Sequence, residues 1–158
     1  MSVNGRAKGR AFEQSIARDL RASLGEGWIV MRNQTDRQRG QQGAAGEFSI
    51  ERVDPASGPG FAWCIECKAH KAFSESMLWR PKVPQLVVEW WRQAVRQADA
   101  IRLRPVLVLR RNHGETLAVV RHDDWHYVTR TPWAMLQLDG EHLRVMRWDD
   151  WRWSALDG

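Results

Sequence analysis

The segment FAWCIECKA, residues 61–69, is an apolar run that carries two charged side chains near its end. Its length and its apolar content predict a buried β-strand. Successive side chains of a strand point to opposite faces, so Cys64, Glu66 and Lys68 are predicted to share one face. Glu66 and Lys68 would then stand roughly 6–7 Å apart, close enough to act on one phosphate group without forming an ion pair.

Two helices are expected before and after this strand in the chain. Residues 7–24 carry apolar side chains at every fourth position and are followed by Gly25, which predicts an amphipathic helix that ends there. Glu13 lies on or beside the apolar stripe of this helix. Residues 85–101 also show helical periodicity, and they are so broadly apolar that we expect this second helix to be largely covered.

Further strands are predicted from short apolar or alternating segments at 28–32, 105–109 and 116–120. Residues 47–53 alternate between two faces and are followed by the turn-rich sequence DPASGPG, so we expect them to form a hairpin with 61–69. The resulting order is helix, strand, strand, strand, helix, strand. It predicts an α/β fold with a central mixed β-sheet flanked by helices.

The part of the chain after residue 120 has no clear periodicity and is rich in tryptophan. Segments 125–128 and 142–148 are each predicted to be a strand or an edge segment. Because the tryptophans need a surface to pack against, we expect residues 121–158 to be an addition packed on a core at about 7–120, within one domain. Most of the ten tryptophans are predicted to be core or interface side chains, and a platform that stacks on unpaired bases is the alternative.

The composition favours some classes of partner and argues against others. Among 158 residues, 24 Lys and Arg face 19 Asp and Glu, and the net charge of +5 suits a polyanionic partner such as DNA. No apolar run is long enough to cross a bilayer and no signal peptide is recognisable, so we expect a cytoplasmic protein without a membrane partner. Cys64 and Cys67 are expected to be buried thiols. The chain contains neither a P-loop nor a G-x-G-x-x-G motif, which argues against nucleotide hydrolysis and dinucleotide binding.

The charged residues of the predicted core suit phosphodiester hydrolysis. That reaction needs a hard cation, which offsets charge on the phosphate and lowers the pKa of an attacking water. Two or three convergent carboxylates suffice to hold magnesium, and a neighbouring ammonium group stabilises the developing charge. The pair formed by Glu66 and Lys68 on one strand face offers one such carboxylate and one such ammonium group.

Three segments carry a resemblance to a known family: GRAFEQSIARDL (9–20), GEFSIE (46–51) and WCIECKAH (63–70). They resemble the PD-(D/E)XK nuclease superfamily, and within it the archaeal-type Holliday junction resolvases and related phage endonucleases, over roughly residues 9–120. The resemblance implies a restriction-endonuclease-like core of order αβββαβ and a DNA endonuclease that uses Mg²⁺ or Mn²⁺. By their places in the motifs, it also implies four catalytic residues, of which the three glutamates bind the metal: Glu13, Glu47, Glu66 and Lys68.

Two features depart from the superfamily pattern. The acid of the second strand is usually an aspartate after proline or glycine, whereas here Glu47 follows Gly46. Glu51 would share its strand face and is the alternative ligand, but a glycine–acid step at a strand start matches the pattern better, so we prefer Glu47. The loop from Arg32 to Gly46 is longer than a compact resolvase needs, so activity on junctions does not follow directly from the resemblance.

Basic residues near the predicted site are candidates for DNA-phosphate contacts. Arg37 and Arg39 lie in the polar loop after the first strand, where solvated surface is the alternative. Arg32, at the end of that strand, and Lys71, just past the E-x-K motif, complete this set.

Two glutamines and two histidines each have two alternative interpretations. Gln93 and Gln97 resemble the glutamine that some superfamily members place near the metal, with a solvated helix face as the alternative. His122 and His126, with Asp124 between them, are either a second metal site or a polar turn, and we prefer the turn.

Other classes of protein remain open. The carboxylates can also be structural, with Glu13 in an ion pair with an arginine and Glu66 in an ordinary salt bridge. The chain would then be a non-catalytic DNA-binding module, or a protein-interaction domain that uses its Trp-rich half. If the likeness to junction resolvases holds, a homodimer is implied, because a junction has two strands to cut.

Overall fold

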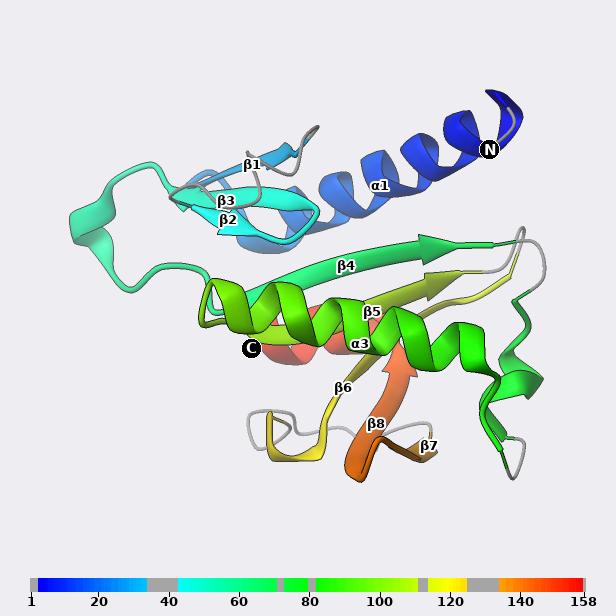
Figure 1. The fold of residues 1–158 in the computed structure, drawn as a ribbon. Coiled ribbons are helices and arrows are strands. Elements are labelled where there is room, and N and C mark those ends of the chain that lie inside the picture. Colours follow the sequence, from blue (N-terminus) through cyan, green and yellow to red (C-terminus); the bar gives the residue numbers. More distant parts are fainter. Residues whose placement is uncertain are drawn as a thin grey trace.

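The computed structural model describes most of the chain and shows an α/β arrangement with a mixed sheet and flanking helices (Figure 1). The described ranges are 3–33, 43–70, 73–79, 82–110, 114–124 and 134–157. No helix within these ranges has the length and the apolar character that crossing a membrane requires.

Helix α1 spans Val3–Leu24 and begins earlier than the sequence predicts. Its apolar stripe faces the core, where Phe12, Ile16 and Leu20 are all buried. The helix ends before Gly25, whose φ of 79° is a left-handed conformation that favours glycine. The predicted position of the helix and its buried face are confirmed.

Two sheets are present in the described part of the chain. The smaller sheet is antiparallel and places β3 (Phe48–Arg52) between β1 (Trp28–Arg32) and β2 (Ala44–Ala45). The larger sheet has the order β4-β5-β6-β8-β7; β4 runs parallel to β5, and the other neighbours are antiparallel. Its strands are β4 (Trp63–Ala69), β5 (Arg104–Arg110), β6 (Thr116–Arg121), β7 (Ala134–Leu138) and β8 (Glu141–Arg147).

The hairpin predicted between residues 47–53 and 61–69 is wrong. Strand β3 pairs instead with β1, and β4 pairs with β5 through a crossover that contains α3 (Gln85–Ala100). A parallel pair requires such a crossover. The first five residues of β4 are buried, and helices lie on both of its sides, which is the environment typical of a parallel strand.

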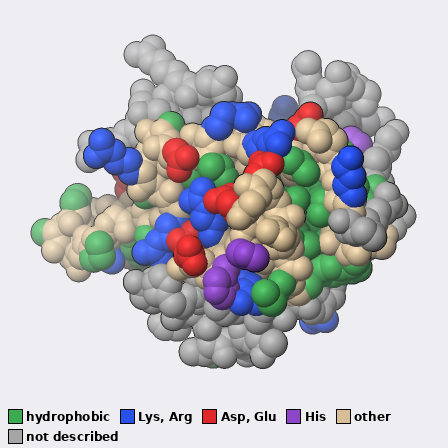
Figure 2. Space-filling model, turned by 60° about the horizontal axis from the view of Figure 1, so that its bottom comes forward, with side chains coloured by type: hydrophobic (Ala, Val, Ile, Leu, Met, Phe, Trp, Pro, Cys, Tyr) green, Lys and Arg blue, Asp and Glu red, His purple; other side chains and the backbone are tan. Residues whose placement is uncertain are grey.

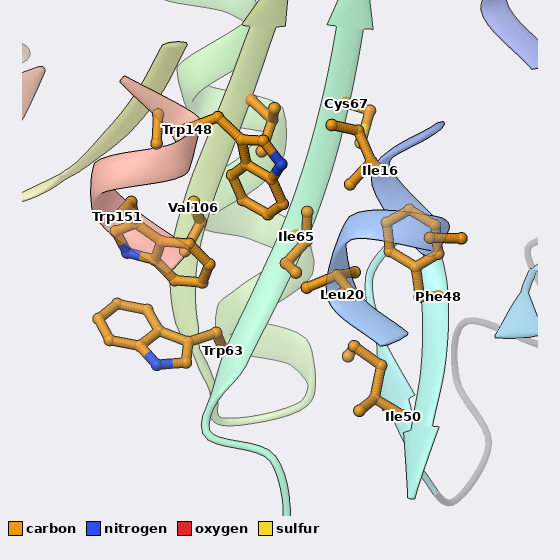
Figure 3. Close-up of a cluster of buried hydrophobic side chains, with 14 of the residues drawn as sticks. Ile16, Leu20, Phe48, Ile50, Trp63, Ile65, Cys67, Val106, Trp148 and Trp151 are labelled. Atoms are coloured by element: carbon orange, nitrogen blue, oxygen red, sulfur yellow. The ribbon is translucent and has the colours of Figure 1, made fainter. Parts of the chain in front are cut away.

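Two hydrophobic cores lie on opposite faces of the larger sheet, whose two sides are covered by different helices, α1 and α3 (Figure 1). The first lies between α1, the smaller sheet and the larger sheet, and it includes Ile16, Phe48 and Ile65 (Figure 3). The second lies under α3 and includes Trp91 and Leu109. Alternate side chains of β4 therefore enter different environments, which decides where its charged residues point.

The C-terminal segment contributes to the larger sheet and to the first core. Strand β8 corresponds to the segment predicted at 142–148, whereas 125–128 lies outside the described residues. Helix α4 (Trp148–Arg152) follows it and buries Trp148 and Trp151 beside Trp63 (Figure 3). The remaining helical segments are Pro55–Ser57, Glu75–Trp79 and His122–Asp124, which are 3-10 turns, and the π-helical turn Trp153–Asp157.

Candidate active site

Glu66 and Lys68 lie on the α3 side of β4, because they alternate with Ile65 and Cys67 of the first core. The Glu66 side chain is 1% exposed and that of Lys68 is 24% exposed. Their charged atoms, Lys68 Nζ and Glu66 Oε1, are 3.4 Å apart, so the prediction that they form no ion pair is wrong. The long lysine side chain folds back because a buried carboxylate is costly without a counter-charge.

Glu47 lies next to Glu66 because its main chain is tied to β4. The Glu47 N–H donates to the Ile65 carbonyl oxygen at 2.8 Å, one residue before Glu66. The Glu47 carbonyl oxygen accepts the Asn33 N–H at 2.7 Å. Glu47 is 4% exposed, so a second carboxylate is buried at the point where β3 meets β4.

Asn33 is a positioning residue that sequence analysis missed. Its amide Nδ2 donates to the Gly46 carbonyl oxygen at 3.1 Å, and its Oδ1 accepts from Ser49 Oγ at 2.6 Å. Asn33 is only 6% exposed. An asparagine after a strand suggests the start of a polar loop, and only the pairing of β1 with β3 shows that this one braces the residue before Glu47.

Gly46 permits the close approach of β3 and β4. It forms an isolated bridge with Ile65 and has a φ of 80°. A Cβ atom at this position would overlap the Ile65 carbonyl oxygen and approach the Cys64 sulfur to 3.0 Å. Any other residue would therefore push Glu47 away from Glu66.

Replacing Gly46 by alanine is expected to lower the free energy of unfolding by about 2–3 kcal/mol, through backbone strain and overpacking. Urea unfolding measures this change. Gly60→Ala is the matched control, because a Cβ at Gly60 meets no atom within 4 Å. Equal stability of the two variants would contradict the close contact between the strands.

Glu13 reaches the same region from α1 and forms an ion pair. Its Oε2 accepts from Arg32 Nη1 at 3.0 Å, with the two side chains 21% and 26% exposed. Arg32 is the last residue of β1, so the pair joins α1 to the smaller sheet. The ion pair with an arginine, which is the structural alternative for Glu13, is therefore present. A catalytic role for Glu13 stays a prediction.

The three glutamates act together on one buried thiol. Burial raises the pKa of Cys67 well above its usual value. Nearby carboxylates raise it further and the Lys68 ammonium opposes them; in order of effect, these carboxylates belong to Glu47, Glu66 and Glu13. Three acids from distant parts of the sequence therefore lie within electrostatic range of the Cys67 thiol.

Glu51, the alternative ligand, lies elsewhere. It is exposed on β3 opposite Ile29, and its charge is not among those that shift the pKa of Cys67. Of the two acids in this part of the sequence, Glu47 is the one that lies with Glu66.

The chain matches one known protein family over most of its length. The family model "Phage putative PDDEXK endonuclease" matches residues 4–144. The chain belongs to this family. The match extends past residue 120, where the likeness of the motifs ends, into β8. No curated protein and no solved structure matches the chain. Membership places the protein among the PD-(D/E)XK nucleases, with DNA as its substrate class.

The carboxylates of Glu13, Glu47 and Glu66 in this PDDEXK endonuclease are oxygen donors that suit a hard cation. Within the described ranges, no three His, Cys, Asp or Glu residues are arranged to hold a metal ion. Two of the predicted metal ligands form ion pairs, Glu13 with Arg32 and Glu66 with Lys68. Oxygen donors of this type fit magnesium, provided that these two carboxylates exchange their cationic partners.

The predicted DNA contacts of the endonuclease stay predictions. Arg32 is described, and its guanidinium group is bound to Glu13. Arg37, Arg39 and Lys71 lie outside the described residues.

Of the two glutamines on α3, Gln93 lines a hollow together with Lys68. Gln97 is half-buried further along the helix. Of the residues weighed as a second metal site, His122 accepts a hydrogen bond at Nδ1 from Arg144 Nε at 2.8 Å, and His126 lies outside the described residues.

The net positive charge of the endonuclease does not by itself locate the DNA. Figure 2 shows one face of the molecule, on which basic and acidic side chains are interspersed. Ion pairs near the β7–β8 turn neutralise part of the charge, with Arg92 bound to Asp139 and Arg121 bound to Glu141. The position of a DNA strand has to be argued from individual residues.

Proposed function

We propose that this endonuclease hydrolyses DNA phosphodiester bonds with Mg²⁺ or Mn²⁺ held by Glu47, Glu66 and Glu13. One observation carries the proposal, namely that the backbone bond from Glu47 to Ile65 brings a second buried acid to the strand that holds the buried Glu66 and its partner Lys68. Buried carboxylates that lie near one another repel, and a bound cation relieves that repulsion. Oxygen donors favour magnesium and manganese over softer metals.

Glu47 and Glu66 are the first ligands that we assign. Both are buried, and the backbone bond from Glu47 to Ile65 keeps them adjacent. Glu13 completes the site directly or through a water after it leaves Arg32. When bound, the cation offsets charge on the phosphate and lowers the pKa of an attacking water.

Lys68 is assigned to the scissile phosphate. Its side chain is 24% exposed, so the ammonium group can turn from Glu66 toward a bound strand. A positive charge held there stabilises the charge that develops on the phosphate oxygens, or it positions the nucleophile. Arg32, once released by Glu13, supplies a further cation to the DNA backbone.

We also propose branched DNA, such as a four-way junction, as a substrate. The support is the likeness of the three motifs to those of junction resolvases. Two symmetric cuts would require two copies of the active site, which a homodimer supplies.

The activity is tested with supercoiled, linear, nicked and four-way-junction DNA, each with Mg²⁺ and with EDTA. Cleavage that depends on Mg²⁺ supports the nuclease proposal, and preference for the junction supports the finer assignment. Cleavage in EDTA would overturn the role of the metal.

Metal binding is predicted to depend on Glu66 and to be independent of Glu51. Calorimetry with Mn²⁺ should show binding to the wild type and to Glu51→Gln, and at least a tenfold loss for Glu66→Gln, comparable with the effect of disturbing a metal ligand. The exposed Glu51 is the matched control, because it lies on β3 with the same change of charge. Unchanged affinity of Glu66→Gln would remove Glu66 from the site.

The same variant separates a nuclease from a DNA-binding module without catalysis. The absence of a three-donor arrangement among the described residues is the observation that favours the module. A module would bind DNA with a salt-dependent affinity that is indifferent to Mn²⁺. The nuclease proposal requires Mn²⁺ binding that Glu66→Gln weakens at least tenfold.

A further inference from the structure

A polar hollow lies against α3 beside Lys68. Its volume is about 480 Å³, within the range of roughly 300–1,000 Å³ found for ligand sites. Trp90 is the one apolar side chain among those that line it. The lining residues are Lys68, Glu89, Trp90, Arg92, Gln93 and Arg96.

The helical residues of this lining form one stripe of α3. Glu89, Gln93 and Arg96 are three or four residues apart, so they share a face of the helix. Seven residues of α-helix extend about 10 Å along the axis. At about 3.4 Å per nucleotide along B-DNA, the stripe matches two or three nucleotides of one strand.

The polar side chains of the hollow differ in whether they already form hydrogen bonds or ion pairs within the protein. Arg92 is held by Asp139 through two bonds, from Nε to Oδ2 and from Nη2 to Oδ1, both 2.7 Å long. In the described part of the chain, Arg96 and Gln93 form neither an ion pair nor a side-chain hydrogen bond. A guanidinium group and an amide of this kind are suitable donors to phosphate oxygens.

We propose that the hollow binds the backbone of the DNA strand that is cut, with Arg96 and Gln93 on a phosphate next to the scissile one. The inference rests on the proposed nuclease function, since it takes Lys68 as the group at the scissile phosphate. Glu89 is the acid that opposes the strand within the hollow. Arg96 therefore supplies the positive charge on which binding there depends.

Asp139 limits the affinity of the same surface by neutralising Arg92. Arg92 and Arg96 also line a second hollow of about 450 Å³ that reaches Asp139, so Arg92 stands between the two. Asp139 has a φ of 50°, a conformation that asparagine also tolerates. Asp139→Asn should therefore keep the turn and release the Arg92 guanidinium for a phosphate.

The test measures the affinity of the full chain for a short fluorescein-labelled oligonucleotide in EDTA, where no metal-dependent cleavage occurs. Arg96→Gln should bind about five- to tenfold more weakly at low salt, and its salt slope should fall by about 0.7–0.9, as for one lost phosphate contact. Arg18→Gln, which removes an equal charge from an exposed position on α1, is the matched control and should change little. Asp139→Asn should bind several-fold more tightly, a gain that misfolding cannot produce.

Two outcomes would overturn the inference, and they are distinguishable. If the wild type cleaves DNA in Mg²⁺, but Arg96→Gln binds like Arg18→Gln and Asp139→Asn binds like the wild type, the hollow is not a strand site and the nuclease proposal stands. If the wild type neither binds nor cleaves DNA, the proposed function and this inference both fail.

Discussion

Lys68→Ala is expected to lower the rate of DNA cleavage about 100- to 1,000-fold, the usual effect of removing one electrostatic group from a transition state. Lys68 Nζ lies 3.4 Å from Glu66 Oε1, and the lysine also lines the hollow beside α3. Its loss removes a positive charge from the place where the phosphate gains negative charge. The rate is measured on plasmid DNA at saturating Mg²⁺.

Loss of stability has to be separated from loss of catalysis in this variant. Removing the lysine leaves the buried Glu66 carboxylate without its counter-charge, which by itself destabilises the fold. The double variant Lys68→Ala/Glu66→Gln should recover that stability and still be inactive. Lys82→Ala removes an equal charge from an exposed position and should retain full activity. Full cleavage by Lys68→Ala would remove this residue from the mechanism.

Trp151→Ala is expected to lower the free energy of unfolding by about 3–5 kcal/mol, as large-to-small changes of a core aromatic do. Trp151 is 0% exposed. Its ring stacks on Trp148 with centroids 5.1 Å apart and meets Trp63 edge-on at 5.3 Å (Figure 3). A cavity at this position would open between α4 and the larger sheet. Urea unfolding measures the loss.

Trp153 supplies the control for this prediction. It lies two positions along the chain but is 47% exposed, so Trp153→Ala should change stability by about 0.5 kcal/mol or less. If Trp151 were instead a platform for unpaired bases, Trp151→Ala would weaken DNA binding and leave stability unchanged. That result would also show that Trp151 does not contribute to the core.

The tryptophans illustrate why composition alone could not assign a role. Trp148 and Trp151 are buried, whereas Trp79 and Trp153 are each 47% exposed. All four occur in similar mixtures of charged and apolar residues. Burial depends on what α4 packs against, and the packing partner Trp63 lies far away in the sequence.

Properties that repeat along a short stretch of chain could be predicted. Helix α1 buries the stripe that contains Phe12 and Leu20, and the alternation of β4 places Glu66 and Lys68 on one side of the strand. These patterns follow from the helical and strand repeats, which the backbone imposes locally. The sequence alone therefore predicted that Glu66 and Lys68 share one side of a strand.

Contacts between distant segments were decided only in the folded chain. The pairing of β3 with β1, the Gly46 bridge that seats Glu47 beside Glu66, and the hollow at Arg96 each join segments with no common periodicity. The ion pair of Glu13 with Arg32 also joins two separate segments, because the packing of α1 on the smaller sheet brings the carboxylate to the guanidinium group. Strand order and charge balance depend on the free energy of the whole packed molecule, which no local pattern contains.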